Sequence, residues 1–131
     1  MSVRDEVEGC VAGFCAALTE RDPEAAASYF HEDATVLAPG VPVVHGLEAV
    51  HGYCADIIAA GVSSPVMRTD EVSELGDAAV TEYGHYEMDI RTRGSESFAD
   101  HGKYVIVYRR DDGGRLRIWL DTFHSDRVSD G

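Results

Sequence analysis

The sequence is poor in positive charge, and it contains no long apolar run. Only 11 residues are Lys or Arg against 24 Asp and Glu, which gives a formal net charge of −13 over 131 residues. So acidic a chain is repelled by phosphate, which argues against binding to nucleic acid or to an anionic membrane surface. No apolar stretch approaches the ~20 residues of a membrane span. The first residues do not show the positively charged start and apolar segment of a signal peptide. We therefore expect a cytoplasmic protein.

Cysteine is also scarce. The three cysteines, Cys10, Cys15 and Cys54, are odd in number and lie within helical patterns. Because they show no C-x-x-C or Cys/His spacing, we interpret them as buried free thiols in a reducing compartment, with a reactive nucleophile as the alternative. The six histidines form no H-x-H or H-E-x-x-H arrangement. We expect neither a metal nor a cofactor. The richness in Ala, Gly, Arg and Asp is compatible with a bacterial genome.

The chain is otherwise typical of one globular domain covering residues 1–131. Hydrophobic residues make up 44% and charged residues 27%, enough for a core without disulfides. The spacing of apolar residues predicts a helix over residues 3–21, a short helix begun by Asp22 and Pro23 and ending near residue 30, and a third from Gly46 to Gly61. The buried stripe of the first would be Val7, Val11, Phe14 and Leu18, and that of the third Leu47, Val50, Cys54, Ile57 and Ile58.

Residues 34–38 read as a short strand, and from residue 65 onward the pattern alternates with period 2. We predict strands over residues 66–75 and 78–91, turns at 76–77 and 93–96, and a final hairpin. Its strands, DHGKYVIVYRR and RLRIWLDTFHSD, are joined by Asp-Asp-Gly-Gly, which suits a tight turn. Helices followed by antiparallel strands predict an α+β fold, in which a curved antiparallel sheet wraps around the N-terminal helices and leaves a cone-shaped cavity.

The final hairpin carries ionisable groups on the face expected to be buried. Strict alternation places Tyr104, Ile106 and Tyr108 on the inward face of the first strand. It places Leu120, Thr122 and His124 on the inward face of the second strand. Phenols, a hydroxyl and an imidazole there suggest a pocket lined by the sheet, not a filled core. The same parity places Lys103, Trp119 and Asp121 outside, as a Lys–Asp cross-strand pair and an aromatic side chain at a dimer interface or rim.

Several motifs resemble those of a known superfamily. These are FHEDATVLAPG, VVHG before a helix, E-x-G-x-Y (Glu82, Gly84, Tyr86), GKY (residues 102–104) and LDTFHSD (residues 120–126). Their order and spacing over residues 7–126 are similar to the nuclear transport factor two-like superfamily, and within it to the SnoaL-like and ketosteroid-isomerase-like branch. The resemblance implies a cone-shaped α+β barrel that forms a homodimer through its outer sheet face. Its members include isomerases, polyketide cyclases, dehydratases, epoxide hydrolases and non-enzymatic modules, so the fold does not fix the function.

The sequence departs from the ketosteroid isomerases at their catalytic positions. The base of those enzymes falls on Ala38, and their two oxyanion donors fall on Phe14 and Ile106. None of these three side chains can transfer a proton or donate a hydrogen bond. The resemblance therefore does not extend to a steroid isomerase that works by that triad.

Four residues are the candidates for catalysis. Desolvation of an inward-facing Glu82 would raise its pKa, so that it could act as a general acid or base near neutral pH. His124 could be its partner, and Tyr86 and Tyr104 could donate hydrogen bonds to a substrate oxygen. The alternatives are a structural carboxylate bonded to neighbouring side chains, a surface histidine, and tyrosines that are only wall residues.

Two functions from different classes follow from this pattern. The first is a cofactor-independent enzyme that isomerises, cyclises or dehydrates a small apolar carbonyl- or epoxide-bearing substrate, as in polyketide or other secondary metabolism. The second is a non-catalytic ligand-binding or dimerisation module; an ionisable group left bare toward an open pocket would favour the enzyme. In either case the predicted pocket wall comprises Phe14, Leu18, His45, Tyr53, Ile57, Val80, Ile106, Tyr108, Leu120 and Thr122.

Overall fold

The computed structural model describes residues 1–91 and 97–127, so the turn predicted at residues 93–96 lies outside the described residues. The chain forms an α+β fold in which helices precede most of the strands, as predicted. The elements in chain order are α1 (Val3–Thr19), α2 (Pro23–Ala27), β1 (Phe30–Leu37), β2 (Val44–His45), α3 (Leu47–Ala59), β3 (Val62–Leu75), β4 (Ala79–Arg91), β5 (Ser97–Arg110) and β6 (Leu116–Ser125).

The first two helices begin at capping residues. Ser2 and Asp5 form a reciprocal capping box at the start of α1, which satisfies backbone N–H groups that have no partner within the helix. Asp22 accepts a hydrogen bond from the backbone N–H of Ala25, and Pro23 occupies the first turn of α2, where its missing N–H is not needed. The apolar stripe predicted for α1 is buried.

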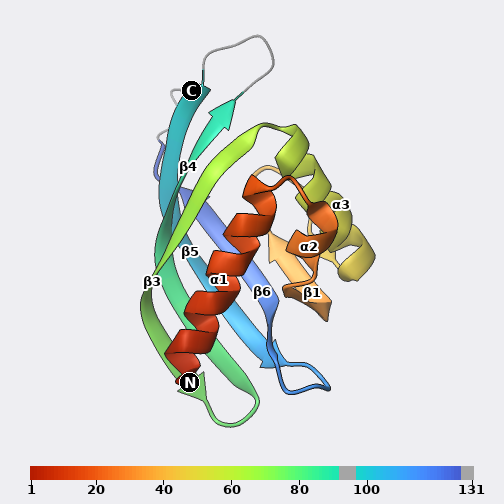
Figure 1. Cartoon of the computed structure of the whole chain (residues 1–131), viewed down its shortest axis with the longest axis vertical. Helices are drawn as coiled ribbons and strands as arrows, with labels where there is room; N and C mark the ends of the chain where they lie inside the picture. Colours follow the sequence, from red (N-terminus) through yellow and green to blue (C-terminus); the bar gives the residue numbers. More distant parts are fainter. Residues whose placement is uncertain (92–96, 128–131) are drawn as a thin grey trace.

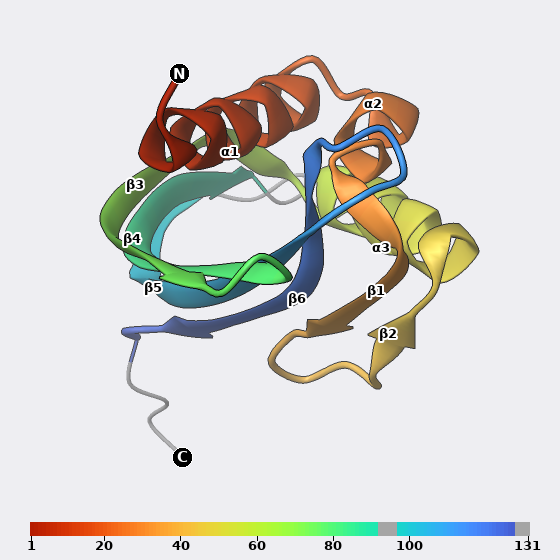
Figure 2. The same ribbon diagram turned by 90° about the horizontal axis from the view of Figure 1, so that it is seen from below.

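The six strands form one sheet in the order β2-β1-β6-β5-β4-β3. The prediction of an antiparallel sheet is wrong at one place, because β1 runs parallel to β6 after the long connection through α3 and the strands that follow it. In the views of Figures 1 and 2 the sheet curves around α1, while α2 and α3 lie beside β1. Among the described residues, no helix is long and apolar enough to cross a membrane.

Two strands begin earlier than predicted. β1 starts at Phe30, the residue where the short helix was expected to end; Phe30 is buried and pairs with Ile118. β3 starts at Val62, although Pro65 was expected to mark its beginning. The pairing of β3 with β4 is irregular between Ser63 and Val66, and such an irregularity accommodates a proline within a strand.

A β-bulge at Trp119 changes the direction of the side chains along β6. Val107 pairs with Leu120, whereas its neighbour Tyr108 pairs with Ile118, so Trp119 has no partner of its own. An extra residue in one strand reverses the alternation of its side chains beyond that point. The part of β6 that follows the bulge therefore faces the opposite way from the prediction by strict parity.

The reversal brings a carboxyl group into the interior. Beyond the bulge, Asp121 is buried and Phe123 packs against the core, whereas His124 is exposed. The predicted outward position of Asp121 is therefore wrong. The predicted Lys103–Asp121 pair is wrong as well, because Lys103 forms its ion pair with Asp126.

Two glycines leave room for tyrosine rings on the inner face of the sheet. A Cβ atom at Gly84 would lie 2.7 Å from the phenol oxygen of Tyr104, and one at Gly102 would lie 2.8 Å from the phenol oxygen of Tyr86. Gly84 pairs with Tyr104, and Gly102 pairs with Tyr86, on adjacent strands. The E-x-G-x-Y and GKY motifs therefore have a packing explanation: each tyrosine ring covers the glycine of the neighbouring strand.

Candidate functional site

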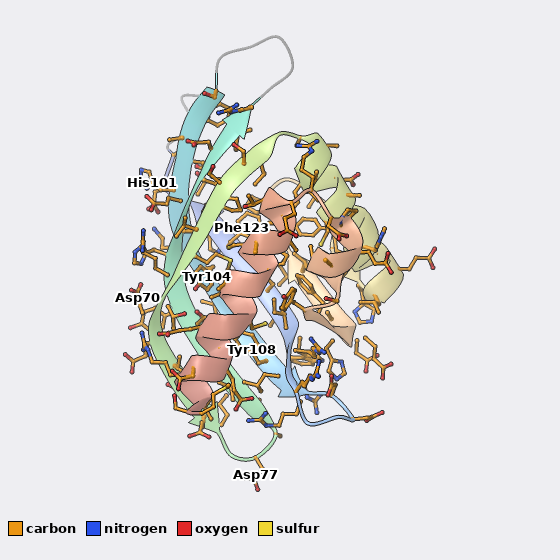
Figure 3. The ribbon with its side chains drawn as sticks, in the orientation of Figure 1. Asp70, Asp77, His101, Tyr104, Tyr108 and Phe123 are labelled. Atoms are coloured by element: carbon orange, nitrogen blue, oxygen red, sulfur yellow. The ribbon has the colours of Figure 1, made fainter. Side chains whose placement is uncertain are left out.

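A cavity of about 200 Å³ lies between the helices and the inner face of the sheet. In the view of Figure 3, Tyr104, Tyr108 and Phe123 lie in the middle of the molecule, where α1 crosses in front of the sheet. Asp70 and His101 lie along the outer side of the sheet. The residues that line the cavity are Phe14, Cys15 and Leu18 of α1, Tyr53 and Ile57 of α3, Val62, Pro65, Val66 and Met67 of β3, Tyr86, Glu87, Met88 and Ile90 of β4, Asp100 and Tyr104 of β5, and Asp121 and Phe123 of β6.

The structure brings part of the predicted wall together. Phe14, Leu18, Tyr53 and Ile57 line the cavity from the helices, and Tyr86 and Tyr104 line it from the sheet. Three further predicted wall residues, Val80, Ile106 and Tyr108, face inward but belong to the packed core outside the cavity lining.

Four predicted residues lie away from the cavity. His45 is exposed on β2, where its ring contacts the hydroxyl of Thr35. Leu120, Thr122 and His124 follow the bulge and face the outer side of the sheet. The prediction that these three residues face the pocket is therefore wrong. Since His124 is exposed and Glu82 is buried, the predicted acid/base pair of these two residues does not form.

Glu82 is buried, as predicted, but it is fully engaged by neighbouring hydroxyl groups. Its carboxylate accepts hydrogen bonds from Tyr104 at 2.6 Å, from Tyr108 at 2.7 Å and from Thr69 at 2.6 Å. It does not line the cavity. Hydrogen bonds of this kind stabilise the ionised form of a carboxyl group. Glu82 is therefore a structural anion in this arrangement, which is one of the two roles considered for it.

The two tyrosines predicted to stabilise a substrate oxygen already donate elsewhere. The Tyr104 hydroxyl donates to Glu82, and the Tyr86 hydroxyl donates to Asp100 at 3.2 Å. Asp100 also accepts a hydrogen bond from Ser125 at 2.6 Å. Burial, and next the charge of Asp100, raise the pKa of Tyr86 to about 12. A phenol has one hydrogen to donate, so the predicted oxyanion role of Tyr86 and Tyr104 is not available in this arrangement.

Asp121 is the carboxyl group that the arrangement leaves bare toward the cavity. Its side chain is 7% exposed and lines the cavity. Within the described ranges no side-chain or backbone group donates a hydrogen bond to its oxygens. Because every fully enclosed side-chain oxygen in those ranges has a partner, the oxygens of Asp121 are not fully enclosed and open onto the cavity. Burial, and next the negative charge of Glu82, raise the pKa of Asp121 to about 7. A carboxyl group with this pKa can both accept and donate a proton near neutral pH.

Tyr53 is a further polar residue in the lining of the cavity that contains Asp121. It reaches the cavity from α3, and its hydroxyl has no hydrogen-bond partner among residues 1–91 and 97–127. Burial raises the pKa of Tyr53 far above its usual range, and the charge of Asp121 contributes next. Tyr53 and Asp121 line the same cavity, and the phenol stays protonated at all ordinary pH values. Tyr53 can therefore donate a hydrogen bond to a ligand in this cavity.

The buried thiols are poor nucleophiles. Cys15 lines the cavity, but burial raises its pKa to about 11, and burial raises the pKa of Cys10 and of Cys54 to about 12. Thiolate is the reactive form, so these cysteines behave as small apolar residues. Across the described part of the chain, no three His, Cys, Asp or Glu side chains lie close enough to hold a metal ion.

Sequence reasoning missed several members of the site. Met88 and Ile90 continue the inward phase of β4, so extending the alternation by four residues would have identified them. Met67 follows from the register of β3 with Tyr86. Asp121 and Phe123 could not be identified by parity, because the sequence carries no local signal for the bulge at Trp119.

Comparisons with known proteins agree with this fold. The SnoaL-like domain family matches residues 11–119 of the chain. No curated protein matches the sequence. A ketosteroid isomerase-like protein from Erwinia carotovora atroseptica has a TM-score of 0.84 at 12% identity, covering 95% of this chain and 96% of its own.

Two further solved structures are similar. One, from Xanthomonas campestris, is proposed to be a calcium/calmodulin dependent protein kinase II association domain; it has a TM-score of 0.83 at 19% identity, covering 98% of this chain and 91% of its own. The other, a nuclear transport factor 2-like superfamily protein from Salmonella enterica, has a TM-score of 0.80 at 13% identity, covering 98% and 96%. At these identities the likeness concerns the fold. With the family match over most of its length, the chain belongs to the SnoaL-like domain family.

Proposed function

We propose that the protein is a cofactor-independent enzyme that moves a proton on a small, neutral, apolar carbonyl compound. The observation that carries the proposal is the buried Asp121 carboxyl group, which faces an apolar cavity, has no hydrogen-bond partner among the described residues and has a pKa of about 7. A general acid/base is most effective when its pKa lies near the working pH. Asp121 takes the role that the sequence suggested for Glu82 and His124.

The chemistry follows from the two bare groups. The Asp121 carboxylate removes a proton from the carbon next to the substrate carbonyl, and the electron pair of that C–H bond moves onto the carbonyl oxygen as an enolate. Tyr53 donates a hydrogen bond to this oxygen, which stabilises the developing charge. The protonated Asp121 then returns the proton to another carbon. The outcome is an isomerisation without net gain or loss of atoms or electrons.

The lining of the cavity favours an uncharged ligand of limited size. Within the described residues it contains no Lys, Arg or His side chain, while Asp100 and Asp121 are both acidic. An anionic substrate would meet repulsion and no counter-charge. The volume of about 200 Å³ lies below the ~300–1,000 Å³ of ordinary drug-sized sites. We therefore infer a substrate with one or two rings or an equivalent chain.

A non-catalytic binding module is the alternative of a different class. The closed cluster around Glu82 is what such a module would have, and one similar structure is proposed to be an association domain. A module has no need, however, for a carboxyl group that faces an apolar cavity and has no hydrogen-bond partner in the described part of the chain, since such a group lowers stability. Asp121 therefore favours the enzyme.

Exchange of carbon-bound hydrogen tests the proposal without knowledge of the natural substrate. We expect the wild-type protein in D₂O to catalyse deuterium incorporation next to the carbonyl of at least one of a panel of cyclic ketones and enones, followed by NMR. Tyr53→Phe should lower this rate by on the order of 10-fold, because one hydrogen bond to the enolate is lost. The matched control is Tyr83→Phe on the outer face of the sheet, which should leave the rate unchanged. Exchange that is equally fast without enzyme for the whole panel would contradict the proposal.

We also propose that two copies pair through the outer face of the sheet. Tyr83 and Val105 are cross-strand partners there, and their side chains are 54% and 46% exposed. An exposed aromatic and β-branched pair in the middle of a sheet is a typical contact patch. We expect a dimer in sedimentation equilibrium and a monomer after Val105→Asp, whereas Thr81→Asp at the sheet's end should remain dimeric. A monomeric wild-type protein would refute the pairing.

A further inference from the structure

We propose that Glu82 is a positioning residue whose buried negative charge acts on Asp121 across the sheet. This inference rests on the proposed function, because it explains why Asp121 is suited to its role. It also gives a second purpose to the hydroxyl groups that surround Glu82, although the Glu82 carboxyl group itself does not line the cavity.

The geometry places the two carboxyl groups in one row of the sheet. Glu82 on β4 pairs with Ile106 on β5, and Ile106 pairs in turn with Asp121 on β6. All three side chains are buried, with Ile106 fully inaccessible between the two acids. Neighbouring strands lie ~4.8 Å apart, so the two backbones are separated by about 10 Å. The buried aliphatic side chain of Ile106 stands between them.

Glu82 is held in a form that can exert this effect. Its three hydrogen bonds come from hydroxyl groups on β3 and β5, namely those of Thr69, Tyr104 and Tyr108. Each hydroxyl donates, so the carboxylate is stabilised as an anion. The three bonds also fix its position, so that it cannot approach Asp121 and share a proton. The result is a fixed negative charge at a fixed distance.

The other titratable groups around Asp121 carry no compensating charge. From α3, Tyr53 and Cys54 face it, and both have raised pKa values caused first by burial. From the neighbouring sheet positions, burial likewise raises the pKa of Tyr104 and Tyr108, and of Cys10 and Cys15 on α1. All of these are neutral at pH 7. The guanidinium of Arg117 on β6 lies toward the surface and is paired with Asp111.

Titration of the Asp121 carboxyl carbon by ¹³C NMR tests the inference without a substrate. The resonance is assigned by its loss in Asp121→Asn. Glu82→Gln keeps the size of the side chain and removes the charge. We expect the pKa of Asp121 to fall in this variant by on the order of one unit, from the Coulomb energy of two charges at this separation in a protein interior. Glu82→Met, a second neutral variant, should shift it in the same direction if Glu82→Gln does not fold.

Asp100→Asn is the matched control, because it removes another buried carboxylate at the far end of the same inner face. Asp100 pairs with Met88, three inward positions from Ile106 on β5, so its removal should leave the Asp121 titration within a few tenths of a unit. An unchanged Asp121 pKa in both Glu82 variants would overturn the inference and leave the proposed function standing. A wild-type Asp121 that titrates below pH 5 would overturn both.

Discussion

Asp121→Asn is expected to make the protein more stable above neutral pH. The pKa of Asp121 is raised from 3.8 to about 7, so between these values the folded state retains a proton that the unfolded state has released. Stability from this group is therefore full below pH 3.8 and is lost as the pH rises through about 7. The loss amounts to about 4 kcal/mol for a shift of three units. The amide has no such loss.

Urea unfolding of both proteins at pH 4 and pH 8 measures this effect. The variant minus wild-type difference in the free energy of unfolding should grow by about 3–4 kcal/mol between the two pH values. Asp77→Asn, in the exposed β3–β4 turn (Figure 3), serves as the control, since its side chain lies in solvent and its substitution should produce no comparable change. A difference for Asp121→Asn that is the same at both pH values would refute the raised pKa.

The same substitution should remove the catalytic activity. An amide cannot accept the substrate proton, and loss of a general base lowers a rate by roughly 10²- to 10⁴-fold. In the deuterium-exchange assay we expect the Asp121→Asn rate to fall to the uncatalysed level while the protein stays folded. Gain of stability together with loss of activity is the signature of a group kept for function. Retained exchange in this variant would assign the proton transfer to another residue.

Gly84→Ala is expected to destabilise the protein by roughly 1–3 kcal/mol, toward the upper end of that range. The added Cβ would collide with the backbone oxygen of Arg68, and it would lie 2.7 Å from the phenol oxygen of Tyr104. A backbone atom within a paired sheet cannot move away easily, and the tyrosine is held by Glu82. Thermal or chemical unfolding measures the change.

Gly52→Ala provides the matched control. Gly52 lies within α3, and a Cβ there would have nothing within 4 Å. Because alanine favours a helix over glycine by about 0.5–1 kcal/mol, the same change should stabilise the protein at this position. Opposite signs for the two substitutions are expected. Equal effects would refute the packing explanation of the E-x-G-x-Y motif.

Much of the fold could be predicted from the sequence because its signals are local. The stripe of Val7, Val11, Phe14 and Leu18 has helical spacing, and Asp22 with Pro23 is a strong start signal. The long β4 and β5 strands alternate regularly, so the inward positions of Glu82 and Tyr104 followed directly. The parallel pairing of β1 with β6 was missed, because it joins segments that are remote in sequence.

The candidate site was harder to predict because it depends on one irregularity. Strict alternation holds along β6 only as far as Ile118, and the unpaired Trp119 then reverses it. Arg109 lies over the Trp119 ring, with its guanidinium carbon 5.1 Å from the ring centre, a contact that helps to keep the ring on the outside. Because of the bulge, the ionisable group of β6 at the cavity is Asp121 and not His124. No local pattern of residues signals this change.

A crystal structure of the protein with 2-naphthol would test the central claim most directly. The ligand is small, apolar and uncharged, and its hydroxyl resembles the oxygen of an enolate. We predict that it occupies the cavity beneath α1, with its oxygen within hydrogen-bond distance of both the Asp121 carboxyl group and the Tyr53 hydroxyl. An oxygen directed instead toward Met88 and Ile90, or a ligand bound only on the outer face of the sheet, would contradict the assignment of Asp121 as the acid/base.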